Sequence, residues 1–225
     1  MTKINLRVKA VIFDMDGVIT NTMPDHFKAW KAVLEPYGVQ VTHYDVYSRE
    51  GQRGINSIKE FFCEKKKVCT PQIIQELLHQ KEQLFKKIVK RRFIPVARRF
   101  IKWLHQNHFK LALVTGTSRH ELPRTLPDYI YKLFDVVVTG SDVTNGKPDP
   151  EPFLLALNKL KIKAQDAVVI ENAPFGIRAA KAAGIKCLAI ATSLREKFLK
   201  EADYIFSDMK TLRRKVNFIL KDNKK

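Results

Sequence analysis

Cysteine is scarce in this chain, with three residues among 225. Cys63, Cys69 and Cys187 are too few and too irregularly spaced for a disulfide framework, so we expect reduced thiols. The sequence also lacks an apolar signal region before its first predicted strand. It has no window approaching the roughly 20 consecutive apolar residues that a membrane span requires. Together these absences predict a cytoplasmic protein with no membrane partner.

Acidic residues are few beside basic ones: 23 Asp and Glu stand against 41 Lys and Arg, which gives a formal net charge of +18. Excess positive charge can bind nucleic acid, steer small anions, or simply lie on a solvated surface. The basic residues are spread along the chain, and their short clusters at 65–67, 90–92 and 213–215 accompany no nucleic-acid-binding motif. We therefore favour a solvated basic surface, then anion steering, and place a non-catalytic nucleic-acid-binding protein last.

The most informative stretch is Val8–Thr22, in which a short apolar segment ends abruptly in acidic residues. Residues 8–13 are typical of a strand buried in a parallel sheet. Asp14 and Asp16 follow directly. Two carboxylates just beyond a buried strand are unfavourable unless a cation or a substrate meets them. Because ligands bind at the carboxyl ends of strands in open α/β sheets, we expect a functional site here.

The rest of the chain divides by its periodicity. Residues 23–93 have apolar positions at helical spacing and no convincing alternation, which predicts an all-helical insert with Trp30 in its core. From Pro95 onward helices and strands alternate, which predicts an α/β fold with a doubly wound, Rossmann-like parallel sheet. We expect a catalytic core of residues 1–22 and 94–225 and an inserted α-helical cap domain of residues 23–93. The later strands are predicted at Leu111–Val114, Val136–Thr139, Ala167–Ile170, Cys187–Ile190 and Tyr204–Phe206, with a closing helix at Leu212–Leu220.

Polar residues also stand at the other predicted strand ends. Thr115 follows one strand, Glu171 and Asn172 follow another, and Lys147 precedes a helix. The carboxyl ends of parallel strands point the same way, so these side chains can meet the acidic pair in one crevice. Carboxylates, a hydroxyl and an ammonium suit phosphoryl transfer with Mg²⁺, because hard oxygen ligands select that ion.

Four segments in this order, DMDGVIT, TGTS, KPDP and ENAPFGIRAAKAAG, resemble the four motifs of the haloacid dehalogenase-like (HAD) hydrolase superfamily. The helical insert after the first motif resembles the cap of the phosphatase and β-phosphoglucomutase branch. The resemblance covers about residues 8–207. It implies a HAD-type core under a cap and a Mg²⁺-dependent phosphoric monoester hydrolase.

The resemblance also implies catalytic roles for four residues. Asp14 would be the nucleophile that forms an aspartyl-phosphate. Asp16 would be the general acid/base that protonates the leaving oxygen and later activates water. Thr115 and Lys147 would bind the phosphoryl group. A carboxylate attacks phosphorus well only where positive charge offsets the repulsion of the phosphate, so a metal ion and Lys147 are needed beside it.

The metal site implied by the resemblance departs from the family pattern at one position. Mg²⁺ would be held by a carboxylate oxygen of Asp14, the backbone carbonyl of Asp16 and the acidic motif at Glu171. That motif usually ends in two acids, and here the second residue is Asn172. An amide carbonyl can still bind Mg²⁺ with one negative charge fewer, so we expect weaker metal binding rather than loss of activity.

Five residues are candidates for substrate binding. Gly116 and Thr117 belong to the TGTS motif. His26 resembles a histidine that couples the cap to the acid/base aspartate in β-phosphoglucomutase-like proteins, and a capping or surface histidine is the alternative. Arg53 resembles a cap arginine that meets a substrate's distal phosphate or hydroxyls, and a solvated arginine is the alternative. Lys81 resembles a cap lysine, but its lysine-rich surroundings favour an exposed side chain.

The first functional hypothesis is a Mg²⁺-dependent phosphatase acting on a small phosphorylated metabolite, a sugar phosphate or a similar monoester. The alternative is a β-phosphoglucomutase-type mutase, which moves the phosphoryl group between hydroxyls. The segment DHFKAWKAVLEPYGV favours the mutase and TGTSRHELPR favours the phosphatase. The two activities differ in whether water reaches the aspartyl-phosphate. We expect a monomer whose partner is the metabolite, not nucleic acid.

Overall fold

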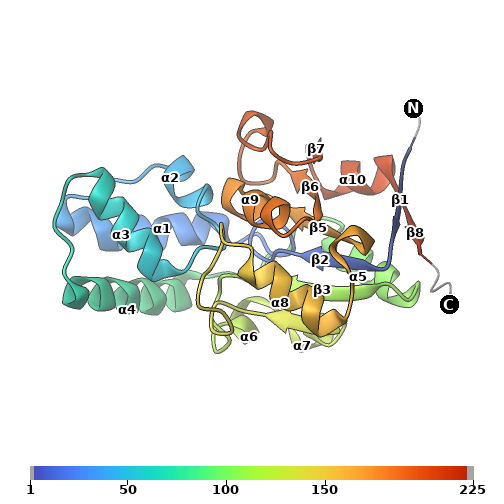
Figure 1. Ribbon diagram of the computed structural model, residues 1–225. Helices are drawn as coiled ribbons and strands as arrows, with labels where there is room; N and C mark the ends of the chain where they lie inside the picture. Colours follow the sequence, from blue (N-terminus) through green and yellow to red (C-terminus); the bar gives the residue numbers. More distant parts are fainter. Residues whose placement is uncertain (1–2, 222–225) are drawn as a thin grey trace.

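The computed structural model describes residues 3–221, and within them the centre of the molecule is a parallel sheet of six strands (Figure 1). In spatial order the strands are β4 (Val136–Val138), β3 (Lys110–Val114), β2 (Ala10–Phe13), β5 (Ala167–Glu171), β6 (Lys186–Ile190) and β7 (Tyr204–Phe206). The predicted α/β parallel sheet is confirmed, and its predicted later strands agree with these bounds to within one residue.

The central strand β2 is buried on both faces because all four of its residues are apolar. Phe13 pairs with Leu113 on one neighbouring strand and with Ile170 on the other. This register puts the residues after Phe13, Leu113 and Ile170 at the same edge of the sheet. Asp14 and Glu171 therefore emerge side by side, and the Asp14 N–H donates to the Ile170 carbonyl at 3.1 Å.

Helices cover both faces of the sheet. Ala10 and Ile12 share a hydrophobic cluster with α8 (Glu151–Leu160) and α9 (Pro174–Ala182). Val11 and Phe13 point the opposite way, toward α5 (Ala97–Gln106) and α10 (Met209–Lys215). Two short helices, α6 (Leu122–Thr125) and α7 (Asp128–Tyr131), join the second cluster. The core is thus the three-layer arrangement that alternating helices and strands predict.

The two ends of the described chain depart from the sequence predictions. β1 (Ile4–Val8) and β8 (Val216–Leu220) pair in parallel as a separate two-stranded sheet, so the predicted strand 8–13 is interrupted and Val8 belongs to a different sheet. The predicted helix Leu212–Leu220 is wrong from Val216 onward. Val216 and Phe218 are buried while Asn217 between them is exposed, and this alternation favours a strand.

The insert between β2 and α5 is helical, as predicted. Within residues 23–88 the chain forms four α-helices, which lie beyond the end of the sheet, on the left in Figure 1. They are α1 (Met23–Leu34), α2 (His43–Tyr47), α3 (Gly54–Glu64) and α4 (Pro71–Ile88). Trp30 is 7% exposed and packs edge-on against Phe61 with ring centroids 5.8 Å apart, so it is a core residue.

The two chain segments that join insert and sheet run side by side. Thr20 and Phe93 form an antiparallel bridge, and the Ile94 N–H donates to the Ile19 carbonyl at 2.9 Å. Next to them the Arg92 guanidinium donates to the Asp25 carboxylate at 2.6 Å. These contacts lie at the ends of the segment predicted as the cap, and the division into cap 23–93 and core stays a prediction. Among residues 3–221, no helix has the length and apolar character needed to cross a membrane.

Candidate active site

Lys147 lies at the centre of the crevice that the strand ends form. Its ammonium donates to Asp14 Oδ1 at 2.6 Å and to Glu171 Oε1 at 2.7 Å. It also donates to the Val114 carbonyl at the end of β3, at 3.2 Å. All three side chains in this cluster are 1% exposed. The structure therefore brings together three polar residues that the sequence places on different strands and loops.

The charges in this cluster do not balance. Burial by itself lowers the pKa of Lys147, but the carboxylates of Asp14 and Glu171 raise it above its ordinary value, so the side chain is an ammonium. Burial raises the pKa of Asp14 to about 8, with the charges of Glu171 and Asp16 adding to the effect and Lys147 opposing it. One ammonium cannot offset all of these carboxylates. A further cation would favour the ionised form of Asp14.

Directly after β2 and β5, two buried side-chain oxygens lack a hydrogen-bond partner among residues 3–221, namely Oδ2 of Asp14 and Oδ1 of Asn172. The Asn172 amide nitrogen donates to Ser193 Oγ at 2.8 Å, which leaves the amide oxygen as the unused atom. Buried oxygens with unused lone pairs are the ligands that Mg²⁺ takes in proteins. The residues present thus fit a Mg²⁺ ion, although both oxygens of Glu171 already accept hydrogen bonds.

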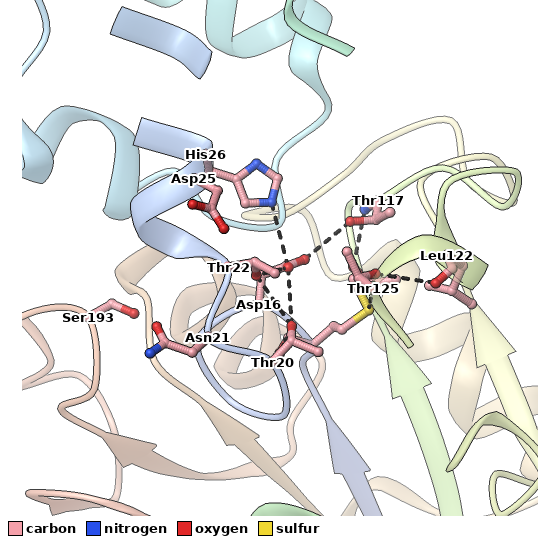
Figure 2. Close-up of polar contacts among 12 residues, drawn as sticks. Asp16, Thr20, Asn21, Thr22, Asp25, His26, Thr117, Leu122, Thr125 and Ser193 are labelled. Atoms are coloured by element: carbon pink, nitrogen blue, oxygen red, sulfur yellow. Dashed lines mark hydrogen bonds and ion pairs between the residues drawn. The ribbon is translucent and has the colours of Figure 1, made fainter. Parts of the chain in front are cut away.

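Asp16 is completely buried and lies between the insert and the sheet (Figure 2). Its Oδ1 accepts hydrogen bonds from the hydroxyls of Thr22 and Thr20, and its Oδ2 accepts one from the Thr117 hydroxyl at 3.2 Å. His26 Nε2 on helix α1 lies 3.6 Å from Asp16 Oδ1. Burial by itself raises the pKa of Asp16, but the His26 ring and the hydroxyls hold it below its ordinary value.

His26 and Lys81, two of the predicted cap residues, both contact the ring of Phe85 in the insert. The His26 ring stacks on Phe85 with ring centroids 4.0 Å apart. Burial and the ammonium of Lys81 hold the pKa of His26 below its ordinary value, which favours a neutral ring. The expectation that Lys81 is exposed is wrong: it is 9% exposed, with its ammonium over the rings of Trp30 (5.3 Å) and Phe85 (4.9 Å). Aromatic faces attract the ammonium and its apolar stem inward.

The loops that carry Gly116 and Arg53 close the insert against the sheet. A Cβ added to Gly116 would lie 2.8 Å from the backbone carbonyl carbon of Gly51. Arg53, in the same segment as Gly51, donates to the Thr144 carbonyl at 2.6 Å. The Thr115 hydroxyl is buried and accepts the Thr117 N–H at 3.1 Å, which shapes the TGTS loop. Insert and core are thus in direct contact beside the buried cluster.

A cavity of about 240 Å³ lies at this contact. Residues from both sides line it, among them His26, Glu50, Arg53, Lys81 and Glu82 from the insert and Gly116, Thr117 and Glu121 from the core. Both acidic and basic side chains line the space. His26 and Thr117 connect the cavity to Asp16, so it is the place where a small ligand would reach the acidic pair.

The comparison with known proteins agrees with this arrangement. A family model described as haloacid dehalogenase-like hydrolase matches residues 11–190. The chain belongs to this family. The matched range contains Asp14, Asp16, Lys147 and Glu171 together with the helical insert.

This hydrolase is similar to phosphatases and to phosphomutases. A phosphorylated carbohydrates phosphatase of Thermotoga maritima is 35% identical over 183 residues, which cover 80% of this chain and 83% of that protein. A β-phosphoglucomutase of Bacillus subtilis is 31% identical over 198 residues, which cover 81% of this chain and 83% of that protein. A solved structure from Bacteroides vulgatus, assigned as a β-phosphoglucomutase, is 32% identical with a TM-score of 0.83 and covers 93% of this chain and 88% of that one.

Four residues of the candidate site were not predicted from the sequence. Thr20 and Thr22 hold Asp16, Ser193 orients Asn172, and Glu50 lines the cavity. Burial together with the charges of Asp16 and Asp14 raises the pKa of Glu50 well above its ordinary value. The two threonines had a usable signal, since hydroxyls follow the acidic pair within a few residues. Ser193 and Glu50 stand in loops with no local pattern.

Closure of the insert over the core can be tested at Gly116. We expect Gly116→Ala to lower kcat/KM by about tenfold or more, because the added methyl group collides with the Gly51 backbone and holds the cavity open. Steady-state kinetics with a hydrolysed substrate measures the effect. Gly184→Ala is the control: it strains a helix end with φ of +72° far from the cavity, so it should lower the unfolding temperature without this kinetic loss. Unchanged kinetics in Gly116→Ala would contradict the close contact.

Proposed function

We propose that this hydrolase is a Mg²⁺-dependent phosphatase that acts on a small phosphorylated metabolite, a sugar phosphate or a similar monoester. The observation that carries the proposal is Lys147 buried between Asp14 and Glu171, beside a partnerless oxygen of Asp14 within the described chain. A carboxylate held against an ammonium, with one oxygen available, is suited to attack an anionic phosphorus centre.

In the proposed reaction a carboxylate oxygen of Asp14 attacks phosphorus while the bond between phosphorus and the ester oxygen breaks. Asp16 gives its proton to that leaving oxygen. In the second half Asp16 takes a proton from water, whose oxygen attacks the aspartyl-phosphate and releases inorganic phosphate. The approach of the anionic phosphate raises the pKa of Asp16 through like-charge repulsion, and this opposes the lowering by its hydroxyl partners. The proton that Asp16 gives in the first half is returned in the second.

The remaining charged groups would position and neutralise the phosphoryl group. Lys147 would bind the phosphoryl oxygens, and Thr115 with the rest of the TGTS loop would complete the anion site. Mg²⁺, held by Asp14, the Asp16 carbonyl and Asn172, would supply positive charge that offsets the repulsion between carboxylate and phosphate. Both oxygens of Glu171 already accept hydrogen bonds from Lys147 and backbone N–H groups. Glu171 would therefore contribute its negative charge near the ion without binding it directly.

The cavity supports a hydroxyl-rich substrate body. Arg53 and Lys81 can donate to hydroxyl oxygens, and Glu50 and Glu82 can accept from hydroxyl protons. All four line the cavity. The similarity to the carbohydrate phosphatase of Thermotoga maritima supports the same class of substrate.

The metal assignment predicts a specific effect of Asn172→Asp. The added negative charge should lower the Mg²⁺ concentration needed for half-maximal activity by about tenfold, because it acts on the ion at short range in a buried site. A Mg²⁺ titration of activity measures this. Ser193→Ala is the matched control, since it removes the hydrogen bond to the Asn172 amide without adding charge. An unchanged Mg²⁺ requirement would show that position 172 is not near the ion.

A β-phosphoglucomutase-type mutase is the second candidate. It is favoured by the direct contact between Gly51 and Gly116, which keeps bulk water from the acidic pair, and by the similarity to the Bacillus subtilis enzyme. The two activities leave different products from the same core, so product analysis separates them.

The test is to incubate the protein and Mg²⁺ with a panel of sugar phosphates and to follow both free phosphate and isomeric sugar phosphates. We expect free phosphate, in amounts equal to the substrate lost, and no product when the metal is chelated. Conversion of a sugar 1-phosphate to a 6-phosphate without phosphate release would support the mutase. Neither product, together with strong salt-sensitive binding to DNA, would support the nucleic-acid-binding alternative.

A further inference from the structure

A second cluster of metal-ligand side chains, none of them ligands in the Mg²⁺ site proposed above, joins the insert to the core. Glu82 on α4 comes from the insert, and His120 and Glu121 come from the loop between β3 and α6 (Figure 1). Each of the three offers a ligand atom, and these atoms all lie within 4.8 Å of one another. The proposed phosphatase reaction gives His120 and Glu121 no role, and it gives Glu82 only a contact with substrate hydroxyls.

Glu121 is the residue that points to a ligand. It is 6% exposed, and its Oε2 accepts a hydrogen bond from the Ser118 hydroxyl at 2.9 Å. Its Oε1 is buried and has no hydrogen-bond partner in the part of the chain that the structure describes. Leaving a buried carboxylate oxygen without a donor or cation is unfavourable, so such an atom indicates a partner that comes from outside the described residues.

We propose that Glu82, His120 and Glu121 bind a divalent transition-metal ion of the Zn²⁺ class and that this ion fastens the insert to the core. One imidazole and two carboxylates are a donor set suited to Zn²⁺, Mn²⁺ or Co²⁺, whereas Mg²⁺ prefers oxygen ligands alone. Three protein ligands leave a coordination position for water. His120 is exposed, which gives the ion access from solvent, and Glu121 anchors it on the buried side.

The site has a direct consequence for the motion of the insert. An ion held by Glu82 on one side and by His120 and Glu121 on the other stabilises the closed arrangement. Glu82 and Glu121 also line the 240 Å³ cavity, so a ligand cannot leave freely while the two remain fastened. When opening limits turnover, a bound ion slows the release of product. Zn²⁺ bound at these three residues would therefore inhibit turnover without binding Asp14 or Asp16.

The experiment titrates Co²⁺ and Zn²⁺ into the full chain at saturating Mg²⁺. Calorimetry measures the affinity for either ion, and visible absorption of Co²⁺ reports its ligands. We expect one ion per chain with a nitrogen and oxygen ligand spectrum. His120→Ala and Glu82→Gln should each weaken binding by at least about tenfold, as loss of a ligand-shell residue does in metal sites. His79→Ala, which removes an exposed histidine from the same helix, should bind as the parent does.

The kinetic arm uses Zn²⁺ inhibition of phosphate release. Zn²⁺ should lower kcat for the parent and for His79→Ala, and His120→Ala should resist it while keeping the parent activity in Mg²⁺ alone. Equal Zn²⁺ affinity in His120→Ala, a thiolate charge-transfer band from Co²⁺ at a cysteine, or no binding beyond the Mg²⁺ site would each overturn the proposal. The binding arm does not depend on activity, so it stands or fails separately from the proposed phosphatase function.

Discussion

Asp14→Asn is expected to lower kcat for phosphate release by at least about a thousandfold, because an amide oxygen is too weak a nucleophile to form the acyl-phosphate. The fold should survive. Burial raises the pKa of Asp14 to about 8, which means that its ionised form is unfavourable in the metal-free folded state. A neutral amide removes that penalty, so the variant should unfold at the same temperature as the parent or higher. Phosphate release and thermal unfolding, measured without and with Mg²⁺, test both parts.

The matched control for this result is Asp166→Asn. Asp166 is also a buried acid of the core, 7% exposed, but it lies just before β5 at the opposite end of the strands and pairs with Lys221. Its replacement should lower stability and leave kcat within a factor of about two. Retained activity in Asp14→Asn, or an equal loss in Asp166→Asn, would show that Asp14 is not the attacking group.

Lys147→Met is expected to lose both activity and stability. Removing one partner of a buried ion pair leaves uncompensated charge and costs about 3–5 kcal/mol in comparable proteins. The activity should fall by at least about a thousandfold, because the ammonium that offsets the phosphate is gone. Urea unfolding and phosphate release measure the two effects. Lys159→Met on α8 is the control, since Lys159 is exposed and should change neither by much.

The stability loss in Lys147→Met should depend on pH in a defined direction. Lys147 opposes the rise in the pKa of Asp14, so its removal moves that pKa further above about 8. An aspartate in the unfolded chain titrates near about 4. Between these values the folded state holds a proton that the unfolded state has released, so stability is retained below about pH 4 and falls as pH rises. A loss of stability that is independent of pH would contradict the buried charge cluster.

The parallel sheet and the acidic pair Asp14 and Asp16 could be predicted from the sequence because both have strong local signals. Four apolar residues in β2 and acids directly after them admit few interpretations. The predicted helix at Leu212–Leu220 was wrong from Val216 onward for a physical reason. Val216–Leu220 forms a strand because it pairs with β1, and no local sequence pattern indicates that pairing. Tertiary contacts decided the conformation there.

The cap residues show a different limit. Lysine-rich surroundings predicted an exposed Lys81, yet the rings of Trp30 and Phe85 hold its ammonium in the interior. Composition reports the average environment of a helix, while burial depends on which face meets a neighbour. The cluster of Glu82 with His120 and Glu121 could not be predicted from the sequence either. Its members come from two parts of the chain that only the folded structure brings together.

The most direct test of the central claim is to quench a single turnover with acid and to analyse the peptides by mass spectrometry. Enzyme, Mg²⁺ and a hydrolysed sugar phosphate are mixed, and samples are taken as free phosphate appears. We predict a phosphoryl adduct on Asp14 that forms before free phosphate appears and disappears as phosphate is released. Phosphate release without any adduct on Asp14, or an adduct on another residue, would contradict it.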